Sequence, residues 1–419
     1  MMPHKIEQQS SASIRLVALL AVAIFINYVD RGTLATAAPL LEDDLRFSPA
    51  QMGMLLSAFF WTYTPTQLAV GWAVERFGAR WLLAGGVAVW SLATLTTGFV
   101  GTFTELLMLR LLLGLGESVV FPCSSSLLAQ NVAIGQRGRS NAAIAVGIAL
   151  GPAVGTFLGG MMMAGGNWRI VFISFGLASL LWVLPWLTLT TAARAQRAPQ
   201  QDSAVPGWLN ILAQRSAWGA AIGHFSSNYA LYFVLSWLPA YLVKERGFSM
   251  AGMAQAGLAI YLLQAVSAAG AGWLLDRFVA RGSAANRVYK TARVASLLLV
   301  SICFVVCALG TTRMALVCLL IAGAMLGVGS SGIFSIAQTL AGPGAAGRWV
   351  GFQNCFANLA GILAPAVTGF IVQQTHSFAG AFVLAAAIAV IGAIGWGAII
   401  RSVSPIEWDA RRLLPQEQH

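Results

Sequence analysis

Residues 14–41 read IRLVALLAVAIFINYVDRGTLATAAPLL, an almost entirely apolar run in which an acid, Asp30, stands beside a base, Arg31. A helix of about 20 apolar residues is long enough to cross a bilayer. An ionisable group inside such a helix costs on the order of 2.5–3.5 kcal/mol even on the more lenient insertion scales. Charges retained at that cost usually face a polar cavity through which an ion or a substrate passes. We therefore expect a membrane span with a functional site at these two residues.

The composition indicates the class of protein. Of the 419 residues, 58% are hydrophobic and only 9% are charged, whereas soluble globular proteins carry about 25% charged residues. The sequence therefore predicts a polytopic membrane protein. The apolar stretch at 14–41 is too long for a cleaved signal peptide, and no small-residue cleavage site follows it. The five cysteines lie in apolar segments without ligand-type neighbours, so we expect no metal site and no cofactor.

Apolar runs separated by short polar turns predict an all-α membrane protein with twelve transmembrane helices in two pseudo-symmetric six-helix bundles. The expected spans are 14–37, 50–74, 81–101, 104–130, 138–163, 167–190, 216–243, 250–276, 291–310, 313–341, 347–373 and 378–400. The only sizeable polar stretch between spans is 191–215. We interpret it as a cytoplasmic linker between an N-terminal six-helix bundle at 1–190 and a C-terminal six-helix bundle with a cytoplasmic tail at 216–419.

The net charge of +11 is explained by the predicted topology. If the N-terminus is cytoplasmic and the loops alternate, most lysines and arginines fall on the cytoplasmic side. Those that fall outside are Arg46, Arg169, Lys244, Arg246 and Arg313. An excess of Lys and Arg in cytoplasmic loops is the usual signal of membrane orientation. We therefore expect a multi-pass protein of the cell (inner) membrane with both termini in the cytoplasm, and no nucleic-acid partner.

The two halves of the chain repeat each other. Asn27-Tyr28 recurs 201 residues later as Asn228-Tyr229, and Gly114-x-Gly116 recurs 213 residues later as Gly327-x-Gly329. Transporters built from related halves bind their substrate near the middle of the membrane, where the halves meet, and rock around it. The repeat therefore predicts a secondary transporter that works by alternating access.

These features resemble the major facilitator superfamily over nearly the whole chain. The stretch 71–80, GWAVERFGAR, resembles the signature loop between helices 2 and 3 of that family, with Glu75 where an aspartate is usual. The resemblance implies a cytoplasmic gate in which a glycine lets helices approach closely and acidic and basic side chains pair. The expected gate residues are Gly71, Glu75, Arg76, Arg80, Asp276 and Arg277.

Within that superfamily the chain is similar to the anion:cation symporters, which include bacterial sugar-acid symporters and the animal sialic acid and vesicular glutamate transporters. The similarity depends on 27–31 (NYVDR), 57–63 (SAFFWTY), 110–118 (RLLLGLGES) and the run around Asn354 and Asn358. The resemblance implies that Arg31, Tyr63 and Arg110 belong to the substrate region, and that Asp30 and Glu117 couple transport to protons. Ala143 stands where those symporters can have a polar pocket residue, so the resemblance leaves the exact substrate open.

Charge balance supports proton coupling. Arg110 and Glu117 are seven residues apart, so they share one face of a helix about 10 Å apart along its axis. With Asp30 and Arg31 they sum to zero formal charge, and an incoming carboxylate would leave the site negative. Because burial and a negative neighbour both raise a carboxyl pKa, Glu117 or Asp30 should then take up a proton. The alternative is that the four residues form two structural ion pairs.

The two arginines are expected to differ in role. Arg31 is expected to hold the substrate carboxylate through two parallel hydrogen bonds. Arg110 is expected to partner Glu117, although it could also touch the substrate. Neutral hydroxyl and amide groups nearby would suit a polyhydroxylated acid. The predicted substrate-binding set is Tyr28, Arg31, Tyr63, Gln67, Arg110, Ser330, Ser331, Asn354 and Asn358. His224 is interpreted as a structural histidine whose hydrogen bonds are satisfied.

The leading hypothesis is therefore a proton-coupled importer of an organic monoanion, most simply a sugar acid of hexonate or hexuronate type, that functions as a monomer. An alternative is an importer of an aromatic or small dicarboxylic acid, because Trp61, Phe225 and Phe352 fall near the expected site. A proton-coupled efflux antiporter is less favoured. We do not expect an enzyme, because no nucleophile–base or metal constellation has suitable spacing.

Overall fold

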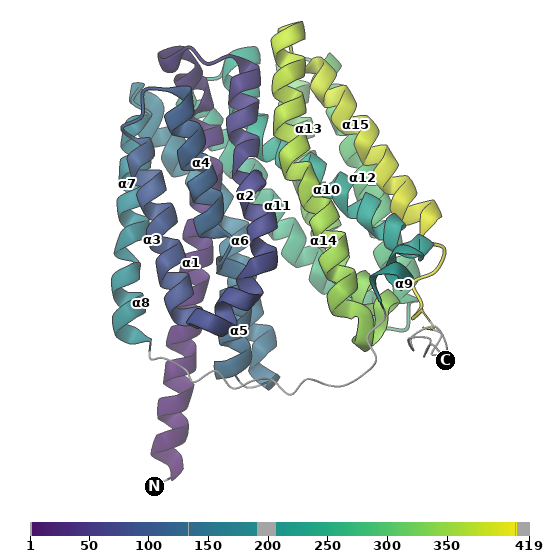
Figure 1. Ribbon diagram of the computed structural model, residues 1–419. Helices are drawn as coiled ribbons and strands as arrows, with labels where there is room; N and C mark the ends of the chain where they lie inside the picture. Colours follow the sequence, from purple (N-terminus) through teal and green to yellow (C-terminus); the bar gives the residue numbers. More distant parts are fainter. Residues whose placement is uncertain (1, 133, 191–206, 407, 409–419) are drawn as a thin grey trace, which may run out of the picture. The chain divides into compact units, whose positions relative to one another are not determined.

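The computed structural model describes residues 2–132, 134–190, 207–406 and 408. Over these residues the regular structure is entirely helical (Figure 1). The α-helices are α1 Met2–Leu45, α2 Pro49–Phe77, α3 Ala79–Thr97, α4 Phe103–Glu117, α5 Val120–Asn131, α6 Ile134–Met162, α7 Arg169–Leu181, α8 Val183–Leu189, α9 Trp208–Leu212, α10 Arg215–Ala240, α11 Met250–Ala280, α12 Ala285–Leu309, α13 Thr312–Ser330, α14 Ile333–Thr375 and α15 Ala379–Ile394. Short helices of other pitch are η1 Met163–Gly165, η2 Tyr241–Glu245 and η3 Gly395–Ile399.

All twelve expected spans fall on helices, which confirms the predicted fold class. Nine helical stretches among the described residues are long and apolar enough to cross a membrane by length and composition. The other three expected spans coincide with α2, α3 and α10.

The chain forms two compact units. Unit 1 consists of Met1–Arg197, Val234–Leu262 and Pro365–Phe378, and unit 2 of Ala198–Phe233, Leu263–Ala364 and Ala379–His419. Within unit 1, α1 packs along α6 and α3 along α7; within unit 2, α12 packs against α13 and α15 (Figure 1). The predicted division into bundles at 1–190 and 216–419 stays a prediction, and 191–206 of the predicted linker lies outside the described residues.

Two transmembrane helices are interrupted at corresponding positions of the two halves. The fourth span breaks between α4, which ends at Glu117, and α5, and the tenth span breaks between α13, which ends at Ser330, and α14. Glu117 and Ser330 are 213 residues apart, the spacing of the internal repeat. Interruptions at matching positions of two repeats are a structural pointer to a transporter's binding site.

The break in the tenth span is held by specific contacts. Gly332 has φ +80°, and a Cβ there would lie 2.7 Å from the Tyr289 ring, so both the backbone and the space favour glycine. Arg293 is 1% exposed and donates from Nη2 to the carbonyls of Ser330 and Ser331 at 3.4 and 3.1 Å. A cation suits these carbonyls, because the C-terminal end of a helix carries partial negative charge.

Candidate functional site

Arg31 on α1 and Glu117 at the end of α4 form a buried salt bridge in unit 1. Arg31 Nε lies 3.2 Å from Glu117 Oε2, and Arg31 Nη2 donates to Asn27 Oδ1 at 3.4 Å. Glu117 and Asn27 are fully buried, and Arg31 is 8% exposed. Removing one partner of a buried ion pair leaves an uncompensated charge, at a cost of about 3–5 kcal/mol. Each residue therefore needs a partner of opposite charge, or Glu117 must be neutralised.

Three aromatic rings surround the Arg31 guanidinium. Its central carbon lies 4.8 Å from the ring centroid of Tyr28, 4.9 Å from that of Phe59 and 4.7 Å from that of Tyr63. Phe59 and Tyr63 stack on each other at 4.9 Å, because residues four apart lie on one face of α2. Cation–π contacts of this kind hold a planar guanidinium in orientation. Phe59 was not predicted as a site residue. Its spacing of four residues from Tyr63 places both on one helix face and could have indicated it.

The expected partnership of Arg110 with Glu117 is wrong in detail, because the salt bridge of Glu117 is made with Arg31. Arg110 is 6% exposed, donates from Nε to the carbonyl of Leu55 at 3.3 Å, and lies 5.6 Å from the Phe59 ring centroid. Arg110 therefore adds a positive charge beside the same aromatic rings, but the salt bridge of Glu117 is formed with Arg31.

Asp30 points to a different neighbour from Arg31. Successive residues of a helix are about 100° apart around its axis, and Asp30 Oδ2 accepts a hydrogen bond from Ser179 Oγ on α7 at 3.0 Å. Asp30 is 2% exposed. The two acids predicted to couple protons therefore have different surroundings, and in the structure it is Glu117 that pairs with the arginine expected to hold substrate.

The remaining predicted binding residues are divided between the units. Gln67 lies one turn after Tyr63 on α2 and is half-buried. In unit 2, Ser330 and Ser331 mark the break after α13, and the Ser331 hydroxyl donates to a carbonyl of α11 at 3.0 Å. Asn354 and Asn358 lie one turn apart on α14. The binding role of these residues stays a prediction.

The expected cytoplasmic gate is described only in part. The surroundings of Gly71 and the side chain of Glu75 lie outside what the structure describes. Arg80 donates to the carbonyl of Leu187 at 2.7 Å and to the hydroxyl of Thr190 at 3.0 Å. These groups belong to the C-terminal end of α8, where a cation is stabilised by the helix dipole. Arg80 therefore has a packing role in addition to any gating role.

The other gate residues make local contacts. Arg76 is exposed at the end of α2. In unit 2, Asp276 accepts a hydrogen bond from the Tyr289 hydroxyl at 2.6 Å, and the Arg277 guanidinium lies 5.1 Å from the Trp273 ring centroid. The gate stays a prediction.

His224 is buried and has a polar partner. It is 4% exposed, and its Nδ1 lies 3.3 Å from Gln353 Nε2, in agreement with a structural histidine.

Lys244, beyond the end of α10, forms an ion cluster with two acids of α1 and was not predicted as a site residue. Its Nζ lies 2.8 Å from Glu42 Oε2 and 2.8 Å from Asp43 Oδ1 on α1. The sequence did contain a signal for this cluster, because the acidic run at 42–44 and Lys244 fall on the same side of the membrane in the predicted topology.

The environment of Lys244 keeps it charged. Burial lowers the pKa of the ammonium, but the hydrogen bonds to Asp43 and Glu42 outweigh burial and raise the pKa above its ordinary value. A raised folded-state pKa of a lysine contributes stability that is present at neutral pH and is lost only as the pH rises through that pKa. Lys244 therefore stays charged over the whole physiological range.

Lys244→Met should lower the unfolding temperature more than Arg169→Met. The Glu42 side chain is 7% exposed and would lose its cation, at a cost of about 1–3 kcal/mol for an unsatisfied buried group. Arg169 pairs with Asp44 at 2.7 Å, but the side chains are 39% and 47% exposed, so this control should cost below about 1 kcal/mol. The measurement is the thermal unfolding temperature of both variants in the same detergent. Equal decreases in that temperature would show that the burial of Glu42 does not strengthen the contribution of its ion pair to stability.

Comparison with known proteins identifies the family. The sequence profile described as Major Facilitator Superfamily matches residues 20–364. The hexuronate transporter of Bacillus subtilis (strain 168) is 29% identical over 415 residues, covering 95% of this chain and 96% of that protein. The probable L-galactonate transporter of Escherichia coli (strain K12) is 28% identical over 407 residues, covering 91% of this chain and 88% of that protein.

Solved structures agree on the fold. An inward-facing, unoccupied bacterial homologue of the human lysosomal transporter Spinster has a TM-score of 0.78 at 17% identity, covering 93% of this chain and 97% of that one. A D-xylose–proton symporter has a TM-score of 0.75 at 14% identity, covering 93% and 98%. The chain therefore belongs to the Major Facilitator Superfamily, as a multi-pass membrane transporter with twelve transmembrane helices in two six-helix bundles, and it is not an enzyme.

Proposed function

We propose that this transporter imports a sugar acid, a monoanion of hexonate or hexuronate type, together with a proton. It would act as a monomer by alternating access in the inner cell membrane, with both termini in the cytoplasm. The main support is the buried salt bridge between Arg31 and Glu117 at 3.2 Å. The similarity to transporters named for hexuronate and L-galactonate supports the class of substrate.

The salt bridge suggests how substrate and proton are coupled. A substrate carboxylate and the Glu117 carboxylate compete for the same Arg31 guanidinium. When Glu117 takes up a proton, it no longer neutralises Arg31, and the substrate carboxylate restores charge balance. When neither ligand is bound, Glu117 is ionised and pairs with Arg31 again. Both the empty and the doubly loaded sites are neutral, and sites with only one ligand carry an unbalanced buried charge.

Reconstituted protein should accumulate gluconate or glucuronate inside proteoliposomes whose interior is more alkaline than the exterior. A pH difference of one unit is equivalent to about 1.4 kcal/mol, so uptake of a monoanion with one proton should reach about tenfold accumulation. The reason is that each inward step moves one anion and one proton without net charge. Uptake of radiolabelled acid is the measurement, with and without a protonophore.

Protein-free liposomes and a neutral sugar, glucose, serve as controls. Accumulation that persists with the protonophore would contradict proton coupling. Expulsion of preloaded acid under the same gradient would indicate an antiporter. An absence of uptake for every acid tested would contradict the proposed class of substrate.

A further inference from the structure

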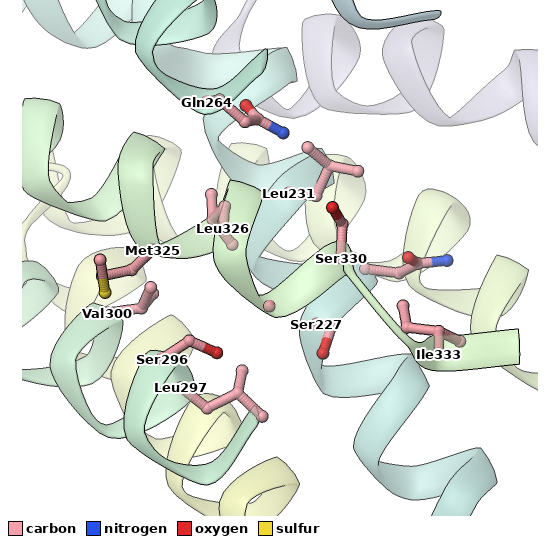
Figure 2. Close-up of a pocket in the computed structure, with 12 residues that line it drawn as sticks. Ser227, Leu231, Gln264, Ser296, Leu297, Val300, Met325, Leu326, Ser330 and Ile333 are labelled. Atoms are coloured by element: carbon pink, nitrogen blue, oxygen red, sulfur yellow. The ribbon is translucent and has the colours of Figure 1, made fainter. Parts of the chain in front are cut away.

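Unit 2 contains a small pocket of about 50 Å³ around the C-terminal end of α13. Its lining comes from α10, α11, α12, α13 and the start of α14 (Figure 2). Polar side chains face it from Ser227, Asn228, Gln264, Ser296 and Ser330. None of the described residues that line it is charged. Ser330 belongs to the predicted substrate-binding set.

The three serines present oxygen lone pairs to the pocket. Ser227, Ser296 and Ser330 each donate their hydroxyl hydrogen to a carbonyl three or four residues earlier in the same helix, at 2.9, 2.9 and 2.7 Å. A serine hydroxyl has one hydrogen to donate and two lone pairs that accept. Because the hydrogens are used within the helices, what remains for a bound group is a set of three acceptors.

The two amides complete the polar set. Asn228 donates from Nδ2 to the carbonyl of Ala357 at 3.4 Å, which leaves its side-chain oxygen as an acceptor. Gln264 faces the pocket from α11 and can both donate and accept. A hydroxyl group, which donates one hydrogen and accepts others, matches this arrangement. An ionised carboxylate only accepts, so it would exchange its hydration for the amide hydrogens of Gln264 and Asn228 alone and lie opposite three serine oxygens, at a free-energy cost.

The size of the pocket limits the group that enters. One water molecule needs about 10–15 Å³ of cavity volume, so a cavity of about 50 Å³ holds roughly three or four non-hydrogen atoms. A hydroxymethyl group fits and a sugar ring does not. Leu231, Leu297 and Val300 provide apolar contacts for its carbon. In Figure 2, Gln264 lies on one side of Ser330, and Ser227, Ser296 and Leu297 lie on the other.

We propose that this pocket binds the uncharged terminal hydroxymethyl group of a sugar acid and excludes a second carboxylate. The inference rests on the proposed function for the presence of an organic acid, and it adds which acids are accepted. Gluconate ends in a hydroxymethyl group at the carbon where glucarate has a second carboxylate. The carrier should therefore prefer monocarboxylic sugar acids to dicarboxylic ones of the same length.

The test compares binding of gluconate, 6-deoxygluconate and glucarate to the purified, full-length carrier by competition with radiolabelled gluconate. The parent protein should bind gluconate at least about tenfold more tightly than glucarate. Ser296→Ala should weaken gluconate binding about three- to tenfold, the loss of one hydrogen bond, and leave 6-deoxygluconate binding unchanged. Ser301→Ala is the matched control, because Ser301 is also buried on α12 but donates to the carbonyl of Ala386 at 2.9 Å.

Three results would overturn the proposal. The first is equal binding of gluconate and glucarate. The second is equal binding of gluconate and 6-deoxygluconate, which would mean that the pocket holds water only, and the third is an equal effect of Ser296→Ala and Ser301→Ala on gluconate binding. Ser330→Ala repeats the test if Ser296→Ala does not fold. A carrier that binds gluconate in an Arg31-dependent way but fails these tests retains the proposed function without this pocket. Binding of none of the acids would contradict both.

Discussion

Glu117→Gln should abolish proton-driven accumulation of substrate while leaving exchange of internal for external substrate intact. The amide imitates the protonated acid, so it never neutralises Arg31, whose Nε lies 3.2 Å from the Glu117 carboxylate. The loaded carrier remains neutral and can reorient. The empty carrier keeps the buried Arg31 charge without the opposite charge of Glu117, and an uncompensated buried charge costs about 3–5 kcal/mol. The accumulation ratio in proteoliposomes should fall from about ten, for one pH unit, to one.

A matched control is available on the same helix. Glu105 also lies on α4, but its carboxylate is exposed and accepts hydrogen bonds from the backbone N–H groups of Gly101 and Thr102 at 2.9 and 3.1 Å. Glu105→Gln removes an equal charge without reaching the buried pair, so accumulation should stay near the parent value. If Glu117→Gln still accumulates substrate under a pH gradient, Glu117 is not the coupling residue and Asp30 becomes the candidate.

The fold could be predicted because membrane insertion imposes strict rules on a single stretch of sequence. Each span must be apolar over its whole length, since the bilayer offers no hydrogen-bond partners to the backbone. All twelve expected spans fall on helices for this reason. The interruptions after Glu117 and Ser330 were not predicted, because each lies inside a long apolar stretch, 104–130 or 313–341, that was interpreted as one continuous span.

The four buried charged residues could be singled out from the sequence, but their partners could not be predicted. Composition singles out Asp30, Arg31, Arg110 and Glu117 because charges in apolar spans are rare. Helical spacing shows only which residues of the same helix share a face. Arg110 was expected to partner Glu117 because the two residues share a face of one helix. The actual partner depends on where the fold brings the Arg31 side chain of α1 close to the end of α4. The same fold turns Asp30 toward Ser179 on α7, a contact 149 residues away in the chain.

Arg31→Lys should lower the affinity for sugar acids about ten- to a hundredfold while the protein folds and inserts. The guanidinium uses three properties that an ammonium lacks: a fork of donors, a plane, and weak hydration. In the structure its Nε contacts Glu117, its Nη2 contacts Asn27, and its central carbon lies between 4.7 and 4.9 Å from three ring centroids. Lysine keeps the charge but loses the paired hydrogen bonds to a carboxylate, each worth about 1.5–3 kcal/mol when charged.

Arg110→Lys is the informative comparison, because Arg110 is equally buried but lies 5.6 Å from the Phe59 ring centroid and donates to a carbonyl at 3.3 Å. If Arg31 holds the substrate carboxylate, Arg31→Lys weakens binding by the larger factor. Arg169→Lys, at the exposed salt bridge with Asp44, should bind like the parent protein. Binding measured by competition, with thermal unfolding as a check on folding, separates these outcomes. If Arg110→Lys has the larger effect, the roles of the two arginines are exchanged, and the pairing of Arg31 with Glu117 serves packing alone.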